Sequence, residues 1–164
     1  MDGPAPAGGM MPKIVLSEPV PATDTPHRIL GAGLGPYAYQ PISDPGLLTQ
    51  FGAFIEHLPP GSRSSFRHWH QTEDEMVFVL AGEVVLIEDT ETTLSAGEAA
   101  CWPAGSPVGH CVENRSDATA SYLVVGTRNI VDRVHYPDHD LVTEKDGQAR
   151  RYLHRDGRPR KETP

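Results

Sequence analysis

The stretch that decides the fold is HWHQTEDEMVFVLAG, which spans residues 68–82. It places the imidazoles of His68 and His70 one residue apart and the carboxylate of Glu75 five residues further on. In a β-strand, side chains alternate between faces, so His68 and His70 point the same way and Trp69 points away. On a helix the same pair would diverge by about 200° and could not share an ion. The spacing therefore predicts a strand that aims both imidazoles at one interior point.

A third imidazole, that of His110, follows later in the chain and completes a candidate metal shell. Imidazole and carboxylate ligands suit Fe(II), Mn(II), Ni(II), Cu(II) or Zn(II) rather than a soft ion such as Cu(I). Three imidazoles and one carboxylate leave one or two positions open on a five- or six-coordinate ion, which is typical of a catalytic or ligand-exchanging metal. Each histidine alone is more often a surface or core residue, and a barrel with an empty pocket is the main competing interpretation.

The composition indicates one globular domain made of short strands. The chain has 164 residues, of which 38% are hydrophobic and 22% charged, and it holds 16 glycines and 16 prolines. This excess of Gly and Pro favours many turns over long helices. The sequence has no apolar run of about 18 residues, so we expect no transmembrane helix and no membrane partner. The first residues lack a basic region followed by an apolar stretch, so we expect no secretory signal and a cytoplasmic protein.

Charge and cysteine content exclude further classes. The formal net charge is −8, whereas a nucleic-acid-binding protein normally carries a basic surface, so we expect no nucleic-acid partner. The basic stretch at residues 150–161 is interpreted as a solvated tail or edge strand. Cys101 and Cys111, in a chain without a secretory signal, are expected to be reduced thiols.

Turn signals divide the chain into an arm, a barrel and an extension. Residues 1–26 are rich in Pro, Ala and Gly and are expected to form a flexible or draped arm, in which Ile14-Val15-Leu16 could dock on a sheet edge. Residues 27–130 are expected to form the barrel, and residues 131–164 an extension with a hairpin around Lys145-Asp146-Gly147. Many short strands separated by regular turns predict an antiparallel sandwich or barrel. The strands are expected at residues 47–58, 66–70, 76–80, 83–88, 92–94, 99–102, 109–112 and 120–126.

The run EMVFVL, residues 75–80, also bears on assembly. If Glu75 and every second residue after it face the interior, then Met76, Phe78 and Leu80 face outward. An outer face this apolar needs a cover, which a second sheet, the N-terminal arm or a partner subunit could provide. We expect a homodimer.

Two motifs in this region resemble those of the cupin superfamily. The first is a Gly, then His-x-His, a Glu after four residues and a Gly after six more, at Gly61, His68, His70, Glu75 and Gly82. The second is a Gly, Pro-x-Gly, a His and an Asn, at Gly97, Pro103, Gly105, His110 and Asn114. The spacing before His68 is one residue longer than usual and that before His110 two residues longer, both in turns that tolerate insertions.

The resemblance covers residues 47–127 and implies an all-β fold. This is a double-stranded β-helix, a small jelly-roll or cupin barrel, with His68, His70, Glu75 and His110 holding a divalent metal such as Fe(II), Mn(II), Ni(II) or Zn(II). The superfamily includes dioxygenases, sugar-phosphate isomerases, decarboxylases, lyases and sensors, so the fold does not fix the function.

Other candidates for the pocket are less specific. Glu56 and His57 lie on one expected strand, so one of them must face inward, and they are the guesses for a catalytic acid or base. Arg63 and Arg67 flank the first ligand and could hold a substrate carboxylate or phosphate, although rim arginines are more often solvated. Trp102 is a candidate pocket wall or core residue.

Two classes of function follow from these residues. The first is a metal-dependent enzyme that acts on a small polar molecule. It would be either an oxidoreductase, namely an Fe(II)-type dioxygenase, or a redox-neutral isomerase or lyase. No acid–base pair can be assigned from sequence for the second of these chemistries. The alternative class is a non-catalytic metal-containing module that binds or senses a small molecule, and a plain structural barrel is a further possibility.

Overall fold

The structure, a computed structural model, describes residues 13–24 and 26–161 as β-strands joined by turns. Within these residues there is no helix, and hence none long and apolar enough to cross a membrane. The strands are β1 (Val20–Ala22), β2 (Tyr37–Pro41), β3 (Phe51–Leu58), β4 (Trp69–His70), β5 (Glu75–Ala81), β6 (Glu83–Ile87), β7 (Glu91–Ser95), β8 (Ala99–Trp102), β9 (Cys111–Glu113), β10 (Ala120–Thr127), β11 (Val131–Tyr136), β12 (Leu141–Asp146) and β13 (Ala149–Leu153).

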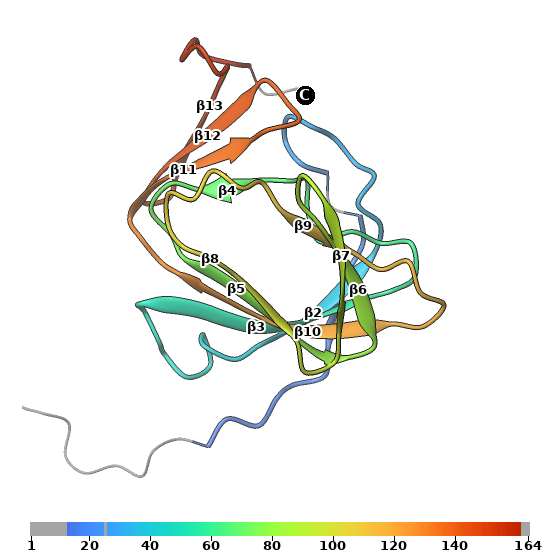
Figure 1. Cartoon of the computed structure of the whole chain (residues 1–164). Helices are drawn as coiled ribbons and strands as arrows, with labels where there is room; N and C mark the ends of the chain where they lie inside the picture. Colours follow the sequence, from blue (N-terminus) through green and yellow to red (C-terminus); the bar gives the residue numbers. More distant parts are fainter. Residues whose placement is uncertain (1–12, 25, 162–164) are drawn as a thin grey trace, which may run out of the picture.

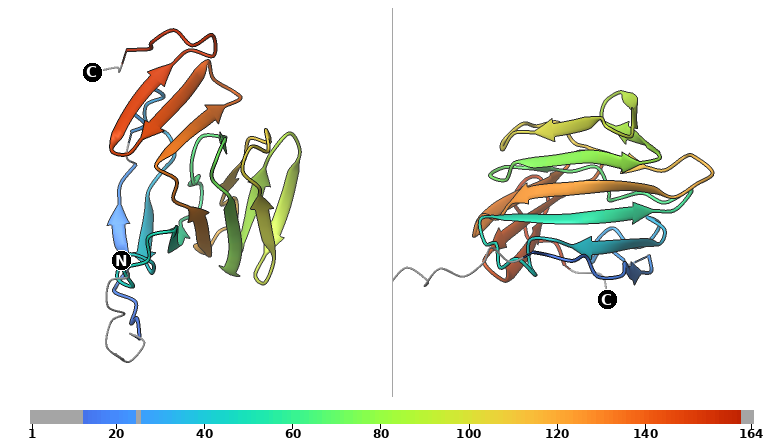
Figure 2. Two further views of the ribbon diagram at one scale, coloured as in Figure 1. Left: turned by 90° about the vertical axis from the view of Figure 1, so that its left-hand side faces the viewer. Right: turned by 90° about the horizontal axis from the view of Figure 1, so that it is seen from below.

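Three antiparallel sheets build the molecule. A six-stranded sheet in the order β1-β2-β3-β10-β5-β8 faces a three-stranded sheet in the order β7-β6-β9, and the interior lies between them (Figure 1). A four-stranded sheet, β13-β12-β11-β4, stands at one end of this barrel (Figure 2). The arrangement is a double-stranded β-helix, as the sequence predicts.

The hydrophobic core fills the closed part of the barrel. Its side chains come from both facing sheets, and Leu58, Val79 and Val84 are almost fully buried there. The expected alternation along β5 is confirmed, because Val77 and Val79 are buried whereas Leu80 on the other face is 44% exposed. Apolar burial from two facing sheets is the main source of stability in such a barrel.

Two expected strands are shorter than the sequence indicates. The strand expected at residues 47–58 begins at Phe51, because Leu47 ends a turn with φ +57° in which its N–H donates to the Asp44 carbonyl. The strand expected at residues 66–70 is reduced to β4, and His68 pairs with His110 as an isolated bridge. The local hydrophobic pattern does not show where hydrogen bonds within a turn replace the hydrogen bonds between strands, so it does not predict where a strand begins.

The C-terminal extension is part of the fold. Its expected hairpin is present as β12 and β13, joined at Gly147, which has φ +57°. The sequence does not predict β11, which pairs with β12 on one side and with β4 on the other, in the register Val134 with His70. The extension therefore attaches directly to the strand that carries the histidine pair.

The N-terminal segment supplies an edge strand. Residues 1–12 and 25 of the expected arm lie outside the described residues. Among the others, β1 pairs with β2 at the edge of the six-stranded sheet, where Pro21 is tolerated because an edge strand has no partner on one side. Ile14-Val15-Leu16, which could dock on a sheet edge, forms no strand there: Ile14 is half-buried, whereas Val15 is 78% exposed.

Asn114 ties two turns of the barrel together, and its loss is expected to be costly. Its buried amide nitrogen donates to the carbonyls of Leu58 and Ala118, and its oxygen accepts from Ser116. In Asn114→Ala these buried groups lose their partner, so we expect the free energy of unfolding to fall by about 2–4 kcal/mol. Urea denaturation measures this change. The exposed Asn129→Ala serves as the control, and equal effects of the two variants would contradict the prediction.

Candidate metal centre

Four separate segments bring the candidate ligands together. His70 lies on β4, Glu75 begins β5, and His68 and His110 face each other through two backbone hydrogen bonds of 3.0 and 3.2 Å. This bridge between His68 and His110 joins the two sequence motifs across the barrel. All four residues that the sequence singles out as metal ligands therefore meet in one place.

The imidazoles converge on a single carboxylate oxygen, Oε2 of Glu75. Its distances to the Nε2 atoms are 2.9 Å for His110, 3.8 Å for His70 and 4.0 Å for His68. His68, His70 and Glu75 each offer a ligand atom within 4.8 Å of the other two, and His110 completes the cluster through Glu75. The predicted inward direction of His68 and His70 agrees with this geometry.

The opposite ring nitrogen of each histidine is held by a hydrogen-bond acceptor. The Nδ1 atom of His68 lies 2.9 Å from the Phe66 carbonyl, and that of His110 lies 3.0 Å from the Val108 carbonyl. The Nδ1 atom of His70 lies 2.7 Å from the Asp132 carboxylate. A carbonyl or a carboxylate only accepts, so each Nδ1 carries the proton. In the neutral ring, Nε2 then presents a lone pair to the centre.

This donor set fits a divalent transition metal. Three lone pairs and a carboxylate oxygen that meet at one point repel each other unless a cation or a proton lies between them. Histidines that ligate metals commonly donate their other N–H to a carboxylate or carbonyl, as all three do here. The residues present thus satisfy both the ligand types and the orientation that such an ion requires.

Burial and neighbouring charges also favour the ligating protonation states. Burial by itself raises the pKa of Glu75, but its contacts with His110, His68 and His70 outweigh burial and bring the pKa to about 2, because a proton between the carboxylate and an imidazole stays on the imidazole. Burial lowers the pKa of His68 to about 4. At neutral pH the carboxylate is therefore ionised and His68 is neutral, as metal ligation requires.

A cavity of about 170 Å³ opens beside the cluster and has largely apolar walls. Trp102 forms one wall, with its indole stacked on the His110 ring at a centroid distance of 3.6 Å and its Nε1 donating to Glu88 at 2.7 Å. From the sequence, Trp102 could be either a core residue or a pocket wall. In the structure its side chain belongs to the core cluster and also lines the cavity. Only a small molecule or part of a larger one fits a cavity of this size.

Glu56 and His57 point to opposite faces of β3. Glu56 lines the cavity, is 8% exposed, and accepts a 2.6 Å hydrogen bond from the Tyr122 hydroxyl. Burial raises the pKa of Glu56 to about 7. His57 bonds Ser121 and Gln40 instead, on the face away from the cavity. A catalytic role remains a prediction, and the geometry narrows it from two residues to Glu56.

The arginines that flank His68 in the sequence are held by other groups. Arg63 pairs with Glu113 at 2.8 Å. Arg67 donates to the carbonyl of Glu88 and to the carboxylate of Asp89. Neither side chain lines the cavity, so both are structural rim residues in this arrangement.

Asp132 contacts a candidate ligand and was not predicted from the sequence. It lies on β11, is 1% exposed, and holds His70 Nδ1 with one carboxylate oxygen and the Thr72 backbone and hydroxyl with the other. Glu73 completes a second acidic group around His70, and Lys145 neutralises it through a 2.5 Å ion pair. The group around Nδ1 therefore orients the ring rather than offering a second ion site.

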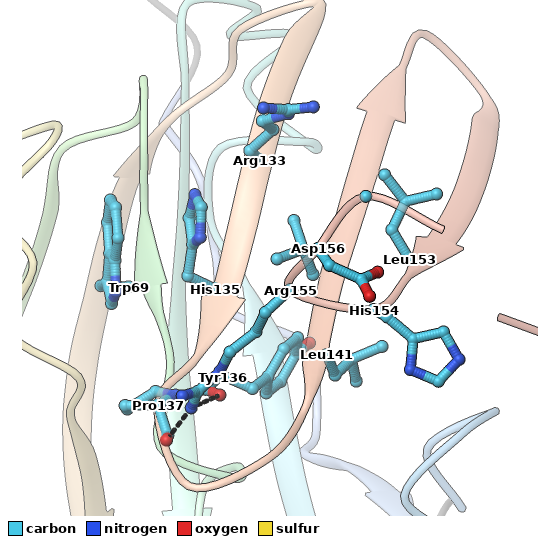
Figure 3. A pocket seen from close by; sticks show the side chains of 12 residues that line it. Trp69, Arg133, His135, Tyr136, Pro137, Leu141, Leu153, His154, Arg155 and Asp156 are labelled. Carbon is cyan, nitrogen blue, oxygen red and sulfur yellow. Dashed lines mark hydrogen bonds between the residues drawn. The ribbon is translucent and has the colours of Figure 1, made fainter. Parts of the chain in front are cut away.

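A larger cavity, about 530 Å³, lies elsewhere, against the C-terminal sheet (Figure 3). The stacked rings of Trp69 and His135 form one side of it, at a centroid distance of 4.0 Å. Its charged groups already have partners, since Arg133 pairs with Glu144 and His154 with Asp140. Among the described residues, its lining contains no metal-ligand cluster of the kind found in the barrel.

Asp132 is expected to set the metal affinity of the centre. In Asp132→Asn the group facing His70 Nδ1 loses its charge, so we expect the affinity for Co(II) to fall by about 10- to 100-fold with an altered visible spectrum. Co(II) titration measures both. His68→Ala should abolish binding, and the exposed Asp89→Asn should leave it unchanged. If Asp132→Asn binds Co(II) like the unmodified protein while the thermal stability of the metal-free protein falls, its role is structural only.

Comparison with known proteins agrees with this geometry. A model of the cupin domain matches residues 54–126. The solved structure of a sugar phosphate isomerase from a cupin superfamily, from Silicibacter pomeroyi, is 36% identical with a TM-score of 0.81, and the match covers 92% of this chain and 97% of that one. No curated protein matches the chain.

Two more distant structures share the fold. One, from Acidithiobacillus ferrooxidans, is provisionally assigned as a sugar phosphate isomerase, with 22% identity, a TM-score of 0.74 and coverage of 82% of this chain and 85% of that one. The other is a predicted oxalate decarboxylase from Thermotoga maritima, with 22% identity, a TM-score of 0.56 and coverage of 71% and 100%. The family match, the extent of the Silicibacter match and the two motifs lead to one conclusion: the chain belongs to the cupin superfamily.

Proposed function

We propose that this chain is a metal-dependent isomerase that moves a proton between neighbouring carbons of a small hydroxy-carbonyl compound. The observation that carries this proposal is that the Glu56–Tyr122 pair and three of the four candidate ligands, His68, Glu75 and His110, line one cavity of about 170 Å³. A carboxyl group and a metal centre facing the same small space are the two elements that redox-neutral proton transfer needs.

In this proposal His68, His70, Glu75 and His110 hold a divalent ion, with Fe(II), Mn(II), Ni(II) and Zn(II) as the candidates. When bound, the ion polarises the substrate carbonyl and so makes the proton on the adjacent carbon more acidic. The stacked Trp102 and the apolar walls exclude water from the space beside this carbonyl.

Glu56 acts as the base that removes this proton and then returns it to the neighbouring carbon. The Tyr122 hydroxyl occupies Oε1, so the other carboxylate oxygen is free for the substrate. A pKa of about 7 gives Glu56 both protonation states near neutral pH, which a group that first accepts and then donates a proton requires. The proton of the substrate hydroxyl passes to the former carbonyl oxygen, so the old carbonyl becomes a hydroxyl and the old hydroxyl a carbonyl. The electron pair stays within the substrate, so no oxidant or reductant is consumed.

The similarity to the Silicibacter pomeroyi structure supports the redox-neutral chemistry, since that protein is described as a sugar phosphate isomerase. An Fe(II) oxygenase would use the same shell but leave the Glu56–Tyr122 pair without a role. A non-catalytic sensor would likewise need no buried carboxyl group beside the metal centre. Oxygen uptake and ligand binding without turnover are the signatures of these two alternatives.

A homodimer also remains a proposal. The outer face of β5 carries the half-buried side chains of Met76 and Phe78 and the exposed Leu80. An apolar face on the outside of the sheet favours coverage by a second copy of the chain. Sedimentation equilibrium decides between a dimer and a monomer.

Glu56→Gln is expected to remove proton transfer while leaving the metal centre intact. The amide keeps the shape of the side chain but cannot act as a base, so kcat should fall by about 10²- to 10⁴-fold with a smaller change in KM. The measurement is deuterium incorporation from D₂O into a panel of aldoses, ketoses and their phosphates, followed by NMR on the metal-loaded protein. His57→Gln, on the other face of β3, is the matched control.

The same assay separates the alternatives. Substrate-dependent O₂ uptake without deuterium exchange would replace the isomerase by an oxygenase. Equal exchange rates for Glu56→Gln and the unmodified protein would rule out Glu56 as the base.

Tyr122→Phe is expected to move the pH profile of the reaction upward. The Tyr122 hydroxyl donates to the Glu56 carboxylate and thereby lowers its pKa against the effect of burial. Without this hydrogen bond the pKa of Glu56 rises, so the limb on which kcat/KM increases with pH shifts to higher pH. A profile between pH 5 and 9 checks this direction. An unchanged limb would show that a group other than Glu56 titrates.

A further inference from the structure

A second cavity adjoins the metal cavity on the inner side of the six-stranded sheet. It measures about 330 Å³ and shares two lining residues, Phe54 and Glu56, with the metal cavity. Phe54 and Glu56 are alternate residues of β3 and point to the same face. The proposed base therefore stands between two compartments, only one of which contains the metal ligands.

A row of three paired residues runs across the six-stranded sheet from the metal centre toward Arg128. Glu75 on β5 pairs with Gly126 on β10, and Gly126 pairs with Gly52 on β3. Residues directly opposite each other in a sheet share a face, and two strand spacings place Gly52 roughly 10 Å from Glu75. Because both are glycines, neither places a side chain on the sheet between Glu75 and the far end of this row.

Arg128 closes the far end of the row. A Cβ atom added to Gly52 would lie 3.2 Å from Arg128 Nε and 3.3 Å from its Nη2, so the guanidinium lies directly over Gly52 on the inner face. Among the described residues that line the two cavities, Arg128 is the only one with a guanidinium or ammonium group. The guanidinium of Arg128 thus lies over Gly52, which is two strand spacings, roughly 10 Å, from Glu75.

The present partners of Arg128 are exchangeable. Its guanidinium pairs with Asp44, whose side chain is 63% exposed, and donates weakly to the Leu48 carbonyl at 3.3 Å and to the Ser43 hydroxyl at 3.4 Å. An exposed ion pair of this kind contributes little, about 0–1 kcal/mol. A phosphate dianion has a higher charge than a carboxylate and accepts two parallel hydrogen bonds from one guanidinium. The guanidinium of Arg128 is therefore suited to release the Asp44 carboxylate and to bind a phosphate in its place.

We propose that Arg128 binds the phosphate group of a phosphorylated sugar whose carbonyl end reaches the metal centre. This inference rests on the proposed isomerase function for the carbonyl end, and it adds the residue that selects a phosphorylated substrate. The sugar carbons pass from one cavity to the other beside Phe54 and Glu56, which line both. Arg63 and Arg67 cannot take this role, because neither lines the two cavities.

The test compares ribose 5-phosphate with ribose as probes of the metal-loaded protein. Calorimetry should show ribose 5-phosphate binding at least about tenfold more tightly than ribose. In Arg128→Gln this preference should disappear. In Asp44→Asn the affinity for ribose 5-phosphate should rise, by about two- to fivefold, because a competing carboxylate is removed. Opposite signs for two members of one ion pair are not expected if the pair is only structural.

Arg63→Gln is the matched control, because it removes a paired arginine outside both cavities and should leave the preference unchanged. Thermal unfolding of each variant verifies the fold, and a misfolded Arg128→Gln is replaced by Arg128→Ala. Inorganic phosphate should compete with ribose 5-phosphate in the unmodified protein. Equal affinity for the two probes, or lower affinity in Asp44→Asn, would overturn the proposal.

Binding and turnover separate this inference from the proposed function. Phosphate-dependent binding without any proton exchange would support the Arg128 site and overturn the isomerase. Equal exchange rates on ribose and ribose 5-phosphate would support the isomerase and overturn the Arg128 site.

Discussion

The convergence of three imidazole Nε2 atoms on one buried carboxylate oxygen is the constraint on which the rest of the structure depends. Acceptors that face each other without a cation or proton are unfavourable, so the barrel must hold them in place from behind. It does so through the Nδ1 atoms, which are fixed by two backbone carbonyls and by Asp132. The bridge between His68 and His110 locks the two motifs in register. Stability from the apolar core offsets the cost of assembling this polar centre.

Alternation along strands explains why much of the site is predictable from sequence. The spacing of His68 and His70 requires a common face, and the structure confirms that both reach Glu75. The same parity makes one of Glu56 and His57 face inward, although it cannot say which one. That choice depends on the register of β3 with β10, which places Tyr122 opposite Glu56. A pairing between strands more than sixty residues apart leaves no mark in a local pattern.

The residues that sequence reasoning missed are those brought in by distant pairings. Asp132 reaches His70 only because β11 pairs with β4, and β11 shows no strong signal in the sequence. Arg128 becomes relevant only because Gly52 and Gly126 lie in one row with Glu75. Arg63 and Arg67, in contrast, are close to His68 in sequence but bond other groups. Proximity along the chain was therefore a poor guide to which cation faces the pocket.

The position of these residues relative to the shared domain suggests how a common barrel acquires its own chemistry. The cupin domain match covers residues 54–126, which includes Glu56, Tyr122 and all four candidate ligands. Arg128 and Asp132 follow within six residues of its end, and Gly52 precedes its start. In the proposed mechanism the barrel holds the metal ligands and the base, whereas the flanking segments contribute Asp132, which bonds His70, and the cation of Arg128. In such an arrangement a change of substrate requires changes in the flanks and leaves the reacting centre untouched, because the two ends of the substrate are held by different parts of the chain.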